Sequence, residues 1–131
     1  MISMREHLRQ RTRIRILVAE DSVFHQKLAI ALLHKAGYLV VVANNGREAV
    51  EALEIEDFDL VLMDVEMPVM NGLEATTVIR QREHKIGGHI PVVGVTSTAI
   101  PEECLAAGMD AHLSKPLRAE TLHRTVQQVL R

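Results

Sequence analysis

The sequence has almost no aromatic residues, with no tryptophan, one tyrosine and two phenylalanines among 131 residues. Hydrophobic residues still make up 47% of the chain, so the core must be built mainly from aliphatic side chains, alanine and methionine. The single cysteine, Cys104, excludes an intrachain disulfide and fits a reducing compartment. We interpret Cys104 as a small core residue rather than a nucleophile.

An excess of charge of one sign is also absent. The formal net charge is -2, whereas domains that bind nucleic acid are normally strongly basic, so no direct contact with nucleic acid is expected. No apolar run approaches the roughly 20 residues that span a membrane, and the first residues lack the apolar stretch of a signal peptide. We therefore expect a cytoplasmic protein without direct membrane contact.

The length favours one domain, because single-core domains usually hold roughly 100–150 residues. The first thirteen residues are polar and differ from the rest. They carry four arginines: Arg5, Arg9, Arg11 and Arg13. We interpret residues 1–13 as a basic leader or linker, with a patch for nucleic acid as the less favoured alternative. Residues 14–131 are predicted to form the folded domain.

Five short apolar runs divide the folded part of the chain. They lie at residues 14–19, 38–43, 58–63, 90–95 and 111–113. These runs are continuous rather than alternating, which is typical of parallel strands that are covered by helices on both faces.

The segments between the runs carry helix signals. Asn45 and Asn71 each precede a glutamate by three residues, as in a capping box. Other signals are the spacing of Phe24, Leu28 and Leu32 before a stop at Gly37, Pro101 followed by Gly108, and the spacing of Leu122, Val126 and Val129. Strand and helix thus alternate five times, which predicts an α/β fold with a doubly wound parallel sheet.

Polar residues follow the predicted strands, at the sheet edge where ligands of doubly wound folds bind. They are Glu20 and Asp21 after the first run, Asp64 after the third, Thr96, Ser97 and Thr98 after the fourth, and Ser114, Lys115 and Pro116 after the fifth. Three clustered carboxylates repel one another unless a cation neutralises them, and Mg²⁺ favours carboxylates, water and phosphate oxygens.

This set of residues suits phosphoryl transfer. One carboxylate could attack phosphorus to form an acyl phosphate, while the other two hold the metal and the lysine adds positive charge. Each acid alone would more often be a helix cap. The combination favours a functional site, although a motif match is a hypothesis.

Four stretches resemble the signature regions of response-regulator receiver domains of two-component signalling systems. They are ILVAEDS, LVLMDVEMPVMNGLEA, PVVGVTSTA and GMDAHLSKPL, in family order. The resemblance covers about residues 14–131, and the block MDVEMPVMNG is its most specific part. It implies a flavodoxin-like (βα)5 sheet of order 2-1-3-4-5, with helices on both faces.

The resemblance also implies a role for each site residue. Asp64 would accept a phosphoryl group from a phosphohistidine, with Mg²⁺ (or Mn²⁺) held by Asp21, Asp64, the backbone carbonyl of Glu66 and, through water, Glu20. Thr96 and Lys115 would bind the phosphoryl group. Glu66 and Thr98 would border it and tune dephosphorylation, and the Lys115–Pro116 peptide bond would be cis.

Two positions depart from the commonest family pattern. Glu20 stands where aspartate is most frequent, and the longer side chain still suits an outer metal ligand. His112 stands where the family usually has the tyrosine or phenylalanine that moves with the threonine, so the switch at this position is in doubt. The other histidines, expected to be surface or interface residues without metal-ligand spacing, are His7, His25, His34, His84, His89 and His123.

The partners implied are a histidine kinase or histidine phosphotransfer domain, and a downstream protein at the face of the fourth helix, fifth strand and fifth helix. The segment NGLEATTVIRQRE resembles receivers of hybrid sensor histidine kinases. The chain is then part of such a kinase, tethered to the inner membrane through it, or a stand-alone regulator. Enzymatic activity stays open, because a receiver catalyses its own phosphotransfer and dephosphorylation.

Two further alternatives belong to other classes. A haloacid-dehalogenase-like phosphatase also has an aspartate after a strand, but it usually needs a second aspartate two residues later and an acidic pair after the fourth strand. In this sequence the residue two positions after Asp64 is Glu66 and not aspartate. The fourth predicted strand is followed by Thr96 and not by an acidic pair. A pseudo-receiver with inert acids would act only as an interaction module, and the intact acidic set argues against it.

Overall fold

The structure is a computed structural model, and it describes residues 13–98 and 100–130. Most of the predicted basic leader, including Arg5, Arg9 and Arg11, lies outside the described residues. Arg13 is described and is exposed to solvent. Within the described part of the chain, none of the helices has the length and apolar character needed to cross a membrane.

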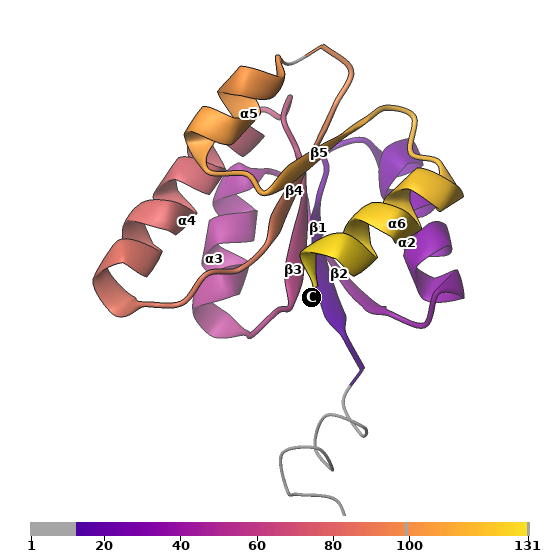
Figure 1. The fold of residues 1–131 in the computed structure, drawn as a ribbon, viewed down its shortest axis with the longest axis horizontal. Coiled ribbons are helices and arrows are strands. Elements are labelled where there is room, and N and C mark those ends of the chain that lie inside the picture. The colour runs from indigo at the N-terminus through magenta and orange to yellow at the C-terminus, as the bar shows by residue number, and fades with distance from the viewer. Residues whose placement is uncertain (1–12, 99, 131) are drawn as a thin grey trace, which may run out of the picture.

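Strands and helices alternate along the whole described chain, with the helices labelled from α2 (Figure 1). The strands are β1 (Arg15–Ala19), β2 (Leu39–Ala43), β3 (Leu60–Asp64), β4 (Val92–Thr96) and β5 (Ala111–Ser114). The helices are α2 (Val23–Lys35), α3 (Gly46–Ile55), α4 (Gly72–Ile86), α5 (Pro101–Ala107) and α6 (Ala119–Val129). Each predicted strand is present, with bounds that shift by one or two residues.

The five strands form one parallel sheet in the order β2-β1-β3-β4-β5, which confirms the predicted fold class. From β1 the chain moves outward to β2, and then crosses back past β1 to β3 and on to β4 and β5. Because all strands run the same way, their carboxyl ends meet at one edge, the upper edge of the sheet in Figure 1.

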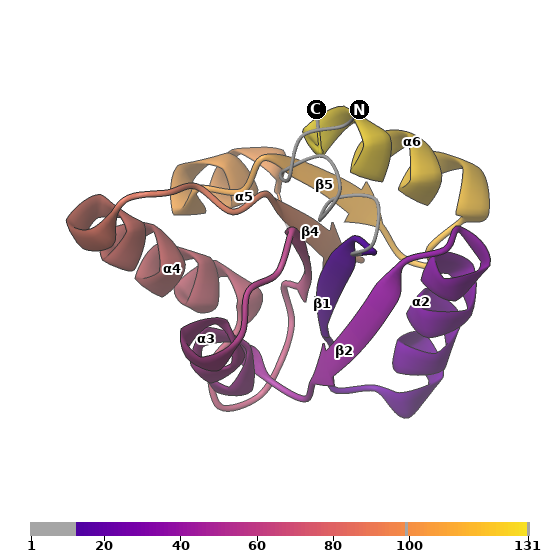
Figure 2. The same ribbon diagram turned by 90° about the horizontal axis from the view of Figure 1, so that it is seen from below.

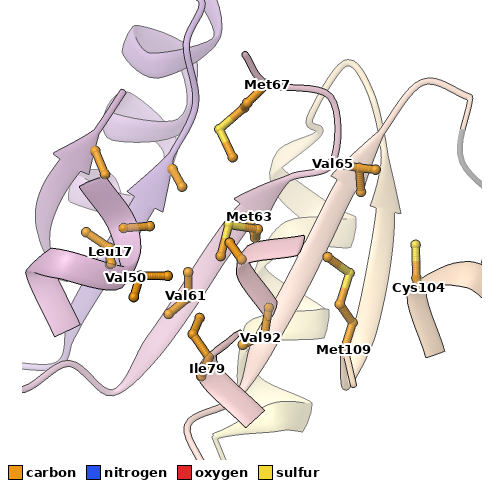
Figure 3. Packing of buried hydrophobic residues seen from close by; sticks show 14 residues of the cluster. Leu17, Val50, Val61, Met63, Val65, Met67, Ile79, Val92, Cys104 and Met109 are labelled. Carbon is orange, nitrogen blue, oxygen red and sulfur yellow. The ribbon is translucent and has the colours of Figure 1, made fainter. Parts of the chain in front are cut away.

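Helices cover both faces of the sheet and create two separate cores (Figures 1 and 2). Alternate residues of β1 show the division: Leu17 packs in the core under α3, α4 and α5, while Ile16 packs in the core under α2 and α6. Figure 3 shows the first of these cores, where Met109 lies beside Gly94 of β4 and Cys104 belongs to α5. Every residue of β3 and β4 is buried, as continuous apolar runs predict.

Local sequence signals set the helix boundaries. Asn71 and Glu74 form the complete predicted capping box of α4, while Asn45 caps α3 through its side chain alone. Pro101 begins α5 and Gly108 ends it in the left-handed conformation. One predicted helix face differs from the structure: Phe24 is 69% exposed at the start of α2, and Ala29 and Leu33 are the buried residues of that helix.

Candidate functional site

The predicted site residues meet at the carboxyl edge of the sheet. Asp64 is the last residue of β3 and Thr96 the last residue of β4. Glu20 directly follows β1, and Lys115 directly follows β5. The parallel order β1-β3-β4-β5 therefore brings together groups that lie up to 95 residues apart in the sequence.

Two buried carboxylates share one lysine at the centre of the site. Nζ of Lys115 lies 2.9 Å from Oδ1 of Asp64 and 3.3 Å from Oε1 of Glu20. Asp64 is only 2% exposed and Glu20 5% exposed, so water screens these charges weakly. The lysine is what allows two like charges to lie so near to each other in a buried position.

The surroundings of Glu20 and Asp64 shift the pKa values of the two acids in opposite directions. Burial raises the pKa of Asp64 to about 7, and the neighbouring charge of Glu20 adds to that effect while Lys115 opposes it. Burial alone would also raise the pKa of Glu20, but the backbone N–H of Ser22, a side-chain hydrogen bond with Asp64 and the charge of Lys115 together lower it. For Lys115, burial would lower the pKa, but Asp64 and Glu20 outweigh burial and raise it.

The acids also fit a divalent cation. One carboxylate oxygen from each of Glu20, Asp21 and Asp64 lies within 4.8 Å of the other two, and Asp21 is exposed while its two partners are buried. Oδ2 of Asp64 is a buried atom with no hydrogen-bond partner among the described residues. Mg²⁺ takes carboxylate oxygens at about 2.0–2.1 Å and retains several waters, which this half-open cluster permits.

Glu66 and Thr96 are joined across the site. The Thr96 hydroxyl donates a hydrogen bond of 2.6 Å to Oε2 of Glu66, and the backbone N–H of Ser97 donates one of 3.4 Å to Oε1. The backbone N–H of Glu66 in turn donates to Oδ1 of Asp64 at 3.2 Å. The backbone N–H of Thr98 donates to the Thr96 hydroxyl oxygen at 3.1 Å, so both residues predicted to tune dephosphorylation contact this threonine.

The backbone around Asp64 is closely packed. A Cβ atom at Gly72 would overlap the carbonyl oxygen of Asp64 and lie 2.9 Å from Cγ of Met63. The N–H of Gly72 also donates to the carbonyl of Val65 at 2.9 Å. On the other side, the backbone N–H of Lys115 donates to the Thr96 carbonyl at 3.0 Å, and the Lys115–Pro116 peptide bond is cis.

The first turn of α2 contributes residues that the sequence analysis did not identify. Ser22 caps the helix, and its backbone N–H donates to Oε2 of Glu20 at 3.0 Å. The side-chain amide of Gln26 donates to the Glu20 carbonyl at 2.6 Å and to Oδ1 of Asn44 at 2.9 Å. Helical spacing from the Ser22 cap could have indicated that Gln26 turns back toward the end of β1.

The histidines differ in their exposure. His7 lies outside the described residues, and His123 on α6 is half-buried, with a buried Nδ1 atom. His112 is exposed on β5, where it pairs in register with Gly94 of β4. His34, His84 and His89 are exposed, as expected. His25 differs from the expected surface residue, because its Nδ1 atom is buried and lies 3.8 Å from Oε1 of Glu20.

This geometry is accompanied by a match to a known family. The family model of the response regulator receiver domain matches residues 16–127, and the chain therefore belongs to that family. Over 120 residues the chain is 37% identical to hybrid signal transduction histidine kinase I of Dictyostelium discoideum. The match covers 86% of this chain but only 7% of that kinase.

Solved receiver structures have the same fold. The receiver domain of the sensor histidine kinase PA1611 of Pseudomonas aeruginosa, which has a magnesium ion coordinated in its active-site cleft, is 34% identical with a TM-score of 0.82; the match covers 91% of this chain and 98% of that one. The receiver domain of Saccharomyces cerevisiae Ssk1, solved with the histidine phosphotransfer protein Ypd1, is 26% identical with a TM-score of 0.84; the match covers 89% and 88%.

Proposed function

We propose that the domain accepts a phosphoryl group from a phosphohistidine on Asp64, with Mg²⁺ or Mn²⁺, and thereby switches its protein–protein interactions. The observation that supports this most is the buried Asp64 carboxylate, which faces Lys115 at 2.9 Å and shares a potential metal cluster with Glu20 and Asp21. Receiver structures with bound magnesium and with a phosphotransfer partner support the same reading.

The transfer is a single displacement at phosphorus. An oxygen of the Asp64 carboxylate forms a bond to phosphorus while the bond from phosphorus to the histidine nitrogen breaks, and the imidazole leaves with the bonding electrons. A bound Mg²⁺ supplies positive charge to the phosphoryl oxygens. Asp21, Asp64 and the backbone carbonyl of Glu66 would hold the ion directly, and Glu20 would hold it through water.

The residues around Asp64 then stabilise the phosphorylated aspartate and change position in response to it. Lys115 pairs with a phosphoryl oxygen, and the Thr96 hydroxyl donates to another once it leaves Glu66. The new charge favours a state in which Thr96 and the face made by α5, β5 and α6 have moved, and this face would bind the downstream partner. His112 lies on β5 within that face. Glu66 and Thr98 would border the phosphoryl group and tune the attack of water on it.

We infer that the domain works within a hybrid sensor histidine kinase, because the relatives named above include such kinases and the chain spans only a small fraction of the kinase it matches. Residues 14–131 would be the receiver and residues 1–13 a basic linker to the preceding part. The location would be cytoplasmic, with tethering to the inner membrane through the parent kinase. A stand-alone response regulator is the alternative.

Labelling with acetyl phosphate and Mg²⁺ tests the acceptor. The parent should incorporate phosphate, Asp64→Asn should incorporate none, and the control Asp57→Asn, an exposed acid before β3, should match the parent. Loss of labelling in the presence of a chelator would show that the transfer also requires a divalent metal ion. Equal labelling of the parent and Asp64→Asn would refute the assignment of Asp64.

The two other classes are separated by different measurements. A haloacid-dehalogenase-like phosphatase would turn over a generic phosphomonoester continuously, and sustained turnover would exclude the receiver mechanism. An inert pseudo-receiver would not bind beryllofluoride, a phosphoryl mimic, in the presence of Mg²⁺. Saturable binding that depends on Asp64 therefore distinguishes a working receiver from an interaction module.

A further inference from the structure

His25 lies next to the site and has no role in the phosphoryl transfer proposed above. It lies in the first turn of α2, where its backbone N–H donates to the hydroxyl of the capping residue Ser22 at 3.4 Å. Its side chain is 32% exposed, but Nδ1 is a buried atom without a hydrogen-bond partner among the described residues. A cavity lined by Glu20, Asp64 and Lys115 also includes His25.

Oε1 of Glu20 lies 3.8 Å from Nδ1. This is longer than a hydrogen bond, and a movement of roughly 0.6–0.9 Å by the ring or the carboxylate would close the gap. The two oxygens of Glu20 have different surroundings. Oε2 accepts from the Ser22 backbone, which is fixed by the helix, whereas Oε1 depends on Lys115 at 3.3 Å.

The ammonium group of Lys115 cannot keep its present contact with Glu20 and also pair closely with a phosphoryl group on Asp64. Its ammonium lies between Asp64 and Glu20, and a phosphoryl group on Asp64 draws it toward the new oxygens. Oε1 of Glu20 then loses its donor while the side chain stays largely buried, which is a costly state for a carboxylate. Nδ1 of His25, at 3.8 Å, is close enough to take the place of the lysine.

We propose that His25 is a positioning residue, whose Nδ1–H donates to Oε1 of Glu20 and replaces Lys115 when the lysine turns to the phosphoryl group. The inference rests on the proposed function, and it concerns how the metal site is kept in place during that function. By holding Glu20, His25 keeps the outer metal ligand in place through the phosphorylation cycle. Partners that orient metal-binding side chains in this way typically change metal affinity or activity by about 10–100-fold.

The test compares beryllofluoride binding at a fixed Mg²⁺ concentration, and Mg²⁺ binding alone, by titration calorimetry. His25→Phe keeps an aromatic ring but cannot donate, and should weaken beryllofluoride binding by about 10-fold. His25→Asn retains a donor at the position of Nδ1 and should recover most of the loss. The matched control is His34→Phe, on the exposed face near the end of the same helix, and it should match the parent.

A second readout does not depend on binding affinity. Nitrogen-15 NMR of the parent with beryllofluoride and Mg²⁺ should show His25 with the proton on Nδ1, which a merely structural ring would not require. The proton on Nε2 would overturn the proposal, even if His25→Phe proved too unstable to titrate. Unchanged binding by a folded His25→Phe would also overturn it. A parent that binds neither Mg²⁺ nor beryllofluoride would instead refute the proposed function, and this inference with it.

Discussion

The hydroxyl of Thr96 donates its one proton to the carboxylate of Glu66, with 2.6 Å between Oγ1 and Oε2. A hydroxyl has a single hydrogen to donate, so Thr96 cannot hold Glu66 and a phosphoryl oxygen at the same time. The two acceptors therefore compete. Glu66 also carries a negative charge close to the position of the phosphoryl oxygens, so it opposes the phosphorylated state in two ways.

Glu66→Gln should therefore tighten binding of beryllofluoride with Mg²⁺. The substitution keeps the shape but replaces a charge-assisted hydrogen bond by a neutral one, which is roughly half as strong. A difference of about 1 kcal/mol corresponds to about 5-fold in the dissociation constant. Titration calorimetry at constant Mg²⁺ measures it.

The control for this prediction is Glu51→Gln, an exposed acid on α3 that is not part of the site. It removes the same charge and should leave the dissociation constant unchanged. Weaker binding by Glu66→Gln than by the parent would contradict the competition between Glu66 and the phosphoryl group. It would indicate that Glu66 assists the bound state.

The raised pKa of Asp64 predicts how stability depends on pH in metal-free protein. The ordinary pKa of aspartate is 3.8, and in the folded protein it is about 7, so the folded state holds the proton more tightly than the unfolded state. The free energy of unfolding should therefore fall as pH rises from about 4 to about 7, and then level off. Asp64→Asn removes this group, and the variant should gain stability over the parent as pH rises.

Urea unfolding of parent and Asp64→Asn at pH 5 and pH 8, with chelator, measures the effect. The advantage of the variant should be roughly 2–3 kcal/mol larger at pH 8, from a shift of about three pKa units weighted by the ionised fractions. The control Asp57→Asn should show the same pH dependence as the parent. An equal difference between parent and Asp64→Asn at both pH values would mean that burial of Asp64 does not shift its titration.

Much of the site could be predicted because topology fixes it. In a parallel sheet the residues that end the strands share one edge, so the apolar runs place Asp64 and Thr96 at the same edge. The strand order that makes them neighbours came from the resemblance to receiver domains. The prediction that Glu20 and Lys115 join them follows from the same rule. The interpretation of Cys104 as a small core residue agrees with the structure, in which it is buried.

Other features depend on side-chain packing that the sequence pattern does not encode. The spacing of Phe24, Leu28 and Leu32 suits a helix, yet the buried residues of α2 are Ala29 and Leu33, which pack in the same core as residues of α6. The hydrogen bond between Glu66 and Thr96 joins the loop after β3 to the end of β4, and it depends on the conformation of that loop. The burial of His25 depends on how closely α2 approaches Glu20.

Gly72 should be essential for the position of Asp64. Alanine at this position would place Cβ against the Asp64 carbonyl oxygen and Cγ of Met63, so Gly72→Ala should destabilise the protein by about 2–3 kcal/mol and weaken binding of beryllofluoride. Urea unfolding and calorimetry measure the two effects, with Gln81→Ala, an exposed substitution on the same helix, as the control. Full stability of Gly72→Ala with parent-like binding would mean that the backbone of β3 and α4 can separate without displacing Asp64.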